Sequence, residues 1–321
     1  MVFSSMVFLC IFLPVVFLLH LILPGIRAKN WMLLLASLVF YAYGEPVYVL
    51  LMIASAFVNY LSALLIEKKP SGKKAVMTIN VILNLGVLVL FKYTGFLAES
   101  FNAIFGTAVP VPAIRLPIGI SFFTFQTMSY TIDVYRGNTD VQKNWISYGT
   151  YVSMFPQLIA GPIVQYKTIA KQMKERRENL DDFTEGIHRF VTGVGKKVLL
   201  ANNIGLLWDA AAALPVAELP VATAWLGALA YTFQIYFDFS GYSDMAVGLG
   251  RMLGFEFLPN FNYPYISKSI TEFWRRWHIS LSTWFKEYLY IPLGGNRCSK
   301  PRWVFNLLVV WAATGIWHGA S

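Results

Sequence analysis

The sequence predicts an all-α polytopic membrane protein with some re-entrant segments. Of its 321 residues, 56% are hydrophobic and only 13% are charged, and the mean hydropathy is +0.53. A soluble chain of this length does not need so much apolar surface. The apolar residues also gather in runs that basic or Pro/Gly-rich stretches separate, which is the pattern of helices in a bilayer.

These apolar runs define the expected helices. The first, Met6–Pro24, has no basic stretch before it and no small-residue cleavage site, so we expect a retained helix with a kink at Pro14. Several runs are shorter than the roughly 20 residues of a straight span, which predicts tilted or re-entrant helices. The later runs are Trp31–Tyr43, Val47–Ile66, Ala75–Phe91, Leu116–Thr131, Trp145–Gln165, Ile187–Leu207, Val221–Phe239 and Val304–Trp317.

Basic residues predict the orientation. Arg and Lys cluster at 25–30 and 67–74, which places both stretches in the cytoplasm and the N-terminus outside. The nearly uncharged stretch 92–115 is then an outside loop. A simple crossing by 145–165 would carry the basic stretch 167–177 outside, so we predict that 145–165 forms a re-entrant hairpin.

The net charge of +9 fits a membrane protein. Excess Lys and Arg mark cytoplasmic loops and lipid head groups, so we expect a bilayer and no nucleic acid as partner. Cys10 and Cys298 have neither a disulfide-like nor a metal-like spacing, so no metal site is predicted.

Without internal repeats, the chain is expected to be a single domain over 1–321. The last apolar run reaches only from Val304 to the end of the chain at Ser321, three residues after His318. We therefore expect further C-terminal helices to be absent from this sequence.

The segment TEFWRRWHISLSTWFKEYLYIPLGGNR (271–297) concentrates charges and aromatic rings in an otherwise apolar chain. Charge at this density is costly in a bilayer and marks a working site or a cytoplasmic face. The spacing predicts one helix that ends before Pro292, followed by a turn at 294–296. One face of that helix carries an apolar stripe of Phe273, Trp277, Leu281, Trp284 and Tyr288.

Two carboxylates, Asp238 and Asp244, interrupt an apolar run and are candidates for function. We expect Asp238 to form an ion pair, and Asp244 to cap a helix that begins at Met245 after a break. His20 and His188 have no partner motif and are expected to be interfacial or structural.

Five segments carry a resemblance to a known family: LPIGISFFTFQTMSYTIDVYRG (116–137), FPQLIAGPIVQY (155–166), YFDFSGYSDMAVGLGRMLGF (236–255), NFNYPYISKSITEFWRRWHISLSTWFKEYLYIPLGGNR (260–297) and TGIWHGAS (314–321). With these segments the chain resembles the membrane-bound O-acyltransferase (MBOAT) family, and within it the membrane subunits that O-acetylate alginate. The resemblance covers residues 1–321. It implies an integral-membrane enzyme whose helices ring a thinned centre, where donor and acceptor meet from opposite sides.

The resemblance also assigns candidate catalytic residues. The family's near-invariant histidine corresponds to His318, and a second position, His or Asn elsewhere in the family, corresponds to His278. Acetyl transfer needs a base, a group that stabilises the oxyanion, and exclusion of water. His318 suits the base, because burial in an apolar helix lowers a histidine pKa and keeps the ring neutral. The alternative is a buried histidine that bonds a neighbouring carbonyl.

His278 has several open roles. It could polarise the thioester carbonyl, orient His318, or only hold the aromatic helix in place. Arg275 and Arg276, with Trp277, are candidates to bind a phosphate-bearing donor such as coenzyme A or a carrier phosphopantetheine. A basic cytoplasmic flank and a packing tryptophan are the alternatives for these residues.

The function expected from these residues is a multi-pass O-acyltransferase of the bacterial inner membrane. It would use acetyl-CoA or another acyl thioester, with no bound cofactor, to acetylate an extracytoplasmic polysaccharide, with alginate as the first candidate. Direct transfer and relay through a periplasmic partner protein both remain open. A transporter or channel subunit of an export complex, with the histidines as proton relays, is the main alternative, and a non-catalytic scaffold is a third. The sequence lacks G-x-S-x-G, P-loop and dinucleotide signatures, which argues against a serine acyl-enzyme and nucleotide-driven transport.

Overall fold

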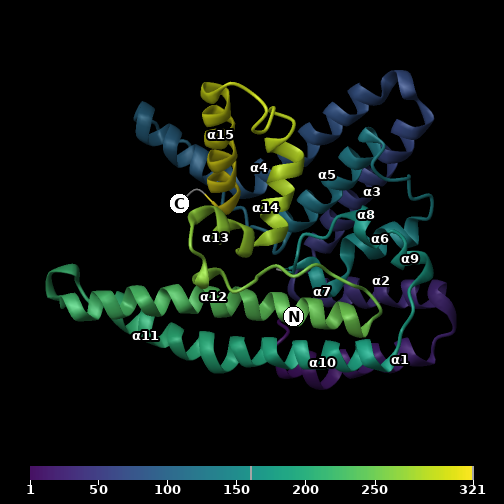
Figure 1. Cartoon of the computed structure of the whole chain (residues 1–321). Coiled ribbons are helices and arrows are strands. Elements are labelled where there is room, and N and C mark those ends of the chain that lie inside the picture. The colour runs from purple at the N-terminus through teal and green to yellow at the C-terminus, as the bar shows by residue number, and fades with distance from the viewer. Residues whose placement is uncertain (160, 320–321) are drawn as a thin grey trace. The chain divides into compact units, whose positions relative to one another are not determined.

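The computed structural model describes residues 1–159 and 161–319, and within these ranges it contains helices and no strand (Figure 1). The chain forms two compact units. The first unit contains Met1–Met32, a short piece at 161–162, and Lys171–Ile279. The second contains Leu33–Ile159, Ile163–Ala170 and 280–319. The prediction of one domain over 1–321 stays a prediction. Ser321, on which the expectation of further C-terminal helices rests, lies outside the described residues.

The first unit is built around two long helical segments joined by a turn. Its elements are η1 (Phe8–Phe12), α1 (Leu13–Ile22), the start of α2 (Gly25–Gly44), α9 (Gln172–Glu175), α10 (Leu180–Gly195), η3 (Lys196–Ala201), α11 (Asn202–Ala212), η4 (Val216–Glu218), α12 (Val221–Met252), η5 (Pro264–Ile266) and α13 (Ile270–Arg276). The predicted first helix is present, with a π-helical turn just before Pro14.

The second unit packs several helices around α5. Its elements are the rest of α2, α3 (Tyr48–Lys68), η2 (Pro70–Gly72), α4 (Lys73–Phe105), α5 (Ile120–Arg136), α6 (Trp145–Ser153), α7 (Phe155–Leu158), α8 (Tyr166–Ile169), α14 (Ile279–Phe285), η6 (Lys286–Tyr290) and α15 (Lys300–His318). Helix α5 is buried along most of its length, so it forms the core of this unit.

Two of the described helices are long and apolar enough to cross a membrane: α3, and the helical stretch Pro70–Phe105. The second is longer than predicted, because α4 continues through residues that were expected to form a loop. The stretch 92–105 contains no proline, and the helix ends only where Gly106 takes a left-handed conformation with φ of 63°. The predicted loop 92–115 is therefore wrong up to Phe105.

The apolar run 145–165 is broken as its prolines suggest. Helix α6 ends at Ser153, and α7 starts at Phe155 with Pro156 in its first turn. The buried start of α7 is held in place, because the Phe155 N–H donates to Ser37 Oγ at 3.0 Å. A re-entrant path for this segment stays a prediction.

Glycines bring α10 into backbone contact with the C-terminal part of α12, and the two helices run side by side in Figure 1. A Cβ on Gly193 would lie 2.5 Å from the Gly241 carbonyl oxygen, and one on Gly248 would lie 2.6 Å from the Gly186 oxygen. Real Cβ atoms do not approach a backbone so closely, so these sites accept only glycine at the observed separation.

Ion pairs flank the same contact. Asp244 accepts from Arg189 at 3.0 Å and from Lys196 at 2.6 Å, and Lys197 pairs with Asp238 at 2.5 Å. The expected ion pair of Asp238 is thus confirmed. The predicted break and cap at Asp244 are wrong, because α12 runs unbroken through it and the carboxylate binds two cations of the neighbouring helix.

Replacement of Gly193 by alanine tests this packing. Alanine favours a helix over glycine by about 0.5–1 kcal/mol, but overpacking against a backbone costs about 1–3 kcal/mol. We expect Gly193→Ala to lower the thermal unfolding midpoint in detergent. Gly195→Ala is the matched control, since a Cβ there meets no atom within 4 Å. Equal midpoints for the two variants would contradict the close contact.

Candidate active site

The Arg-rich helix α13 has a well-defined start. The Glu272 N–H donates to the Ser269 side chain at 3.1 Å, and the Lys268 N–H donates to Glu272 Oε2 at 2.9 Å. This resembles a capping box, which satisfies the free N–H groups of a helix start. The bond from the Lys268 N–H, followed by that from Arg276, lowers the pKa of Glu272, so the carboxylate stays charged.

The chain bends sharply at His278. Helix α13 ends at Arg276, Trp277 is extended, and His278 has a left-handed φ of 45° before α14 begins. The single helix predicted over this segment is therefore wrong. A left-handed conformation is uncommon for residues other than glycine, and it persists only where neighbouring structure holds it.

The segment 260–262 holds this bend. The Asn262 N–H donates to the Arg276 carbonyl and the Ile279 N–H donates to the Asn260 carbonyl, both at 2.9 Å. Asn260 also places its side-chain oxygen 3.2 Å from His278 Nδ1. Since an amide oxygen only accepts, Nδ1 carries the proton in this arrangement, and Nε2 is the acceptor atom of the neutral ring.

One aromatic ring packs against the histidine, and further rings pack against the neighbouring Trp277. His278 is 2% exposed, and the Phe239 ring of α12 meets it edge-on at 4.7 Å. Trp277 packs edge-on to Phe261 at 5.1 Å and stacks on Phe273 at 5.6 Å. The contacts of Trp277 fit the packing role that was its alternative.

The two arginines of α13 differ in their contacts. Arg276 donates to Glu272 at 2.9 and 3.0 Å and to the Asn262 carbonyl at 3.1 Å, so the fold already uses its guanidinium. Arg275 is exposed, and it has no ion pair among the described residues. Of the two candidates for binding a phosphate-bearing donor, Arg275 is the more accessible.

His318 is the last residue of α15, in the second unit. The preceding Trp317 is buried against Phe122 and Phe125, each with ring centroids 5.8 Å away, while His318 itself is exposed in the described chain. The expected burial of His318 is thus wrong for these residues. Its backbone is fixed by the packing of Trp317, whose ring lies edge-on to the imidazole at 4.8 Å.

Lys92 is a residue that the sequence analysis did not select. It lies in the second of the two membrane-length helices, and it donates a hydrogen bond to the Trp317 carbonyl. Its Nζ is 5.6 Å from the centre of the Trp317 ring. An ionisable residue inside a membrane helix is a functional candidate. The signal was missed because the predicted helix stopped at Phe91.

The structure therefore groups some of the predicted site residues. Arg275, Arg276, Trp277 and His278 are consecutive in the first unit, with Asn260 and Phe239 as partners that sequence reasoning missed. His318 belongs to the second unit, beside Lys92. A joint centre of the two histidines stays a prediction.

Known proteins match the chain along its whole length. It is 49% identical, over 100% of its residues, to the probable alginate O-acetylase AlgI of Pseudomonas aeruginosa, and it spans 62% of that relative's length. It is 38% identical over its whole length to the peptidoglycan O-acetyltransferase of Helicobacter pylori, of which it spans 67%. A teichoic acid D-alanyltransferase of Bacillus subtilis is 29% identical over 64% of the chain and 54% of the relative.

A family model confirms the predicted resemblance. The model described as MBOAT, membrane-bound O-acyltransferase family, matches residues 140–321, which is more than half of the chain and contains both His278 and His318. The chain belongs to the membrane-bound O-acyltransferase family.

Proposed function

We propose that this protein is a membrane O-acyltransferase that moves acetyl groups from a thioester donor for O-acetylation of an extracytoplasmic polysaccharide. The similarity over the whole chain to proteins named as alginate O-acetylases, at 47–49% identity, carries this proposal and makes alginate the first candidate. The chain spans 62% of the length of the Pseudomonas aeruginosa relative. A multi-pass location in the inner membrane and a periplasmic partner protein are parts of the same proposal.

The reaction requires one base and one leaving group. We assign His318 as the base that takes the proton of an acceptor hydroxyl. The hydroxyl oxygen then attacks the thioester carbonyl, the carbon–sulfur bond breaks, and the thiolate takes the proton from the imidazolium. An exposed imidazole on a backbone fixed by Trp317 is accessible to a polymer hydroxyl.

His278 is assigned the assisting role. The fold holds its ring through Asn260 and Phe239, so its orientation is set before substrate binds. With Nδ1 donating to Asn260, the neutral ring accepts a proton at Nε2, whereas polarising a carbonyl would need the protonated ring. We propose acetyl-CoA as donor, with Arg275 as a contact for its phosphates.

The transporter alternative gains no support from the relatives. The relatives reported above that match the whole chain are named for O-acetylation, and two that match 64% of it are named for transfer of alanine to teichoic acid. Both names describe transfer of an acyl group, which favours transfer chemistry over transport.

Replacement of His318 by alanine is the primary test. We expect a loss of about 10²–10⁴-fold in acetyl transfer, the usual contribution of general base catalysis. The measurement is ester-bound acetate on the secreted polysaccharide, at matched membrane levels of the protein. His188→Ala is the control, since His188 is exposed on α10 and outside the site. Equal acetate with His318→Ala and the control would overturn the assignment.

Two replacements of His278 test whether the site needs a side chain that keeps the backbone bend and the contact with Asn260. Asparagine tolerates a left-handed conformation and can bond Asn260, whereas alanine can do neither as well. We therefore expect His278→Asn to keep the protein stable and more active than His278→Ala, measured by thioester turnover in micelles. If both variants keep the turnover of the unmodified chain, the side chain at this bend does not assist the reaction.

A pair of Lys92 variants tests the electrostatics at His318. His318 comes after the two membrane-length helices in the chain and is part of neither. Although the side chain is exposed, nearby protein atoms partly desolvate it, and this desolvation and the Lys92 ammonium both lower the pKa of His318. Because the base must be neutral, its activity is lost as pH falls through that pKa. Lys92→Met removes the cation and raises the pKa, so the acid limb of the pH–rate profile should move to higher pH. Lys92→Arg keeps the cation and should leave it in place.

The two profiles must be compared at equal levels of folded protein. A lower rate in Lys92→Met with an unmoved acid limb would mean that Lys92 only caps the end of α15. Coinciding profiles and rates for both variants and the unmodified chain would remove Lys92 from the site.

A further inference from the structure

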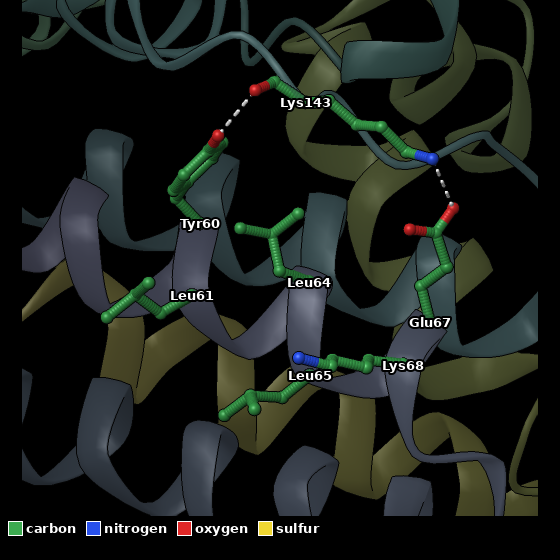
Figure 2. Close-up of a pocket in the computed structure, with 7 residues that line it drawn as sticks. All are labelled: Tyr60, Leu61, Leu64, Leu65, Glu67, Lys68 and Lys143. Atoms are coloured by element: carbon green, nitrogen blue, oxygen red, sulfur yellow. Dashed lines mark hydrogen bonds and ion pairs between the residues drawn. The ribbon is translucent and has the colours of Figure 1, made fainter.

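A pocket of about 700 Å³ lies at one end of α3, in the second unit (Figure 2). One wall is apolar, and the two leucines Leu61 and Leu65 in it are 40% and 43% exposed. Polar side chains form the rim. The lining residues are Tyr60, Leu61, Leu64, Leu65, Glu67, Lys68 and Lys143.

The rim is cationic and can rearrange. Lys68 has no acidic partner among the described residues. Lys143 reaches across to Glu67 with 3.4 Å between Nζ and Oε1, and both side chains are largely in solvent (Figure 2). Exposed pairs of this kind contribute about 0–1 kcal/mol, so a phosphate can displace Glu67 from Lys143 at little cost.

The pocket lies where a bilayer would place lipid head groups. Helix α3 and the stretch Pro70–Phe105 are the two membrane-length helices, and the turn between them follows the pocket directly. That turn adds Lys69, Lys73 and Lys74 to the rim lysines. A group of lysines just beyond a membrane helix attracts anionic lipids.

Aromatic side chains support the same placement. Tyr60 donates its hydroxyl hydrogen bond to the Lys143 carbonyl at 2.7 Å, which fixes the loop that carries Lys143. Trp145, two residues later, packs edge-on against Phe57 and Tyr60, with ring centroids 5.6 and 5.4 Å apart. Trp and Tyr are enriched at the boundary between hydrocarbon and head groups.

We propose that this pocket binds an anionic phospholipid. The lipid phosphate lies between Lys68 and Lys143, and one acyl chain lies along Leu61, Leu64 and Leu65. The exposed leucines select a lipid over free phosphate, because an inorganic ion would leave this apolar wall in water. The lysines select an anionic lipid over a zwitterionic one.

Binding is measured on the full chain in neutral detergent micelles by native mass spectrometry. The probes are dioleoyl phosphatidylglycerol, dioleoyl phosphatidylcholine with the same acyl chains, and inorganic phosphate. We expect bound phosphatidylglycerol at several-fold higher occupancy than phosphatidylcholine, and no displacement by millimolar phosphate. Equal occupancy by the two lipids, or displacement of lipid by phosphate, overturns the proposal.

Variants locate the binding. Each lysine near an anionic head group contributes about 1 kcal/mol, so Lys68→Gln with Lys143→Gln should weaken phosphatidylglycerol binding about tenfold or more. Lys171→Gln with Lys174→Gln removes the same charge from exposed positions in the first unit and is the matched control. Leu64→Trp fills the apolar wall and should reduce occupancy with the charges intact. An equal effect of the pocket and control variants would overturn the proposal.

Discussion

The backbone pairing of residues 260–262 with the bend at His278 is the constraint on which the candidate site depends. Two hydrogen bonds of 2.9 Å hold Arg276 and Ile279, and the Asn260 side chain meets the His278 ring. With both ends fixed, His278 takes a left-handed conformation that a free chain would rarely adopt. The same bend turns Trp277 into its aromatic cluster, so ring packing and histidine orientation depend on one local structure.

The apolar runs of the sequence predicted most helices but not their limits. Helices α3 and α12 begin close to their predicted starts, because a long apolar run in a chain of this composition has few alternatives. The predicted helix limits are wrong where contacts with another segment of the chain determine the local structure. Asp244 continues a helix because Arg189 and Lys196 bind it, and the helix predicted around His278 breaks because Asn260 and Asn262 compete for its backbone. The spacing of residues within the helix itself does not reveal any of these partner residues.

The candidate site was predictable only as a set of residues. The motif match selected His278 and His318. It did not select Asn260, which lies 18 residues before His278 in the same matched segment, or Lys92, which lies 225 residues before Trp317. The contacts also divide the charges that looked alike in the sequence. Within the first unit, ion pairs are formed by Arg276, Asp238 and Asp244. Arg275 forms no ion pair among the described residues. A charge that the fold does not use is the better candidate for a ligand contact.

The exposed position of His318 fits catalysis only if something other than its neighbours excludes water. Acyl transfer from a thioester competes with hydrolysis, so the reacting atoms need a dry environment. The outward side of α15 supplies an apolar surface, with Phe305, Leu308, Trp311 and Ile316 exposed. Such a surface is stable against hydrocarbon and unfavourable against water. If the bilayer or the acyl chain of a neighbouring lipid covers it, an imidazolium beside it is disfavoured, and His318 stays in the neutral form that a general base requires.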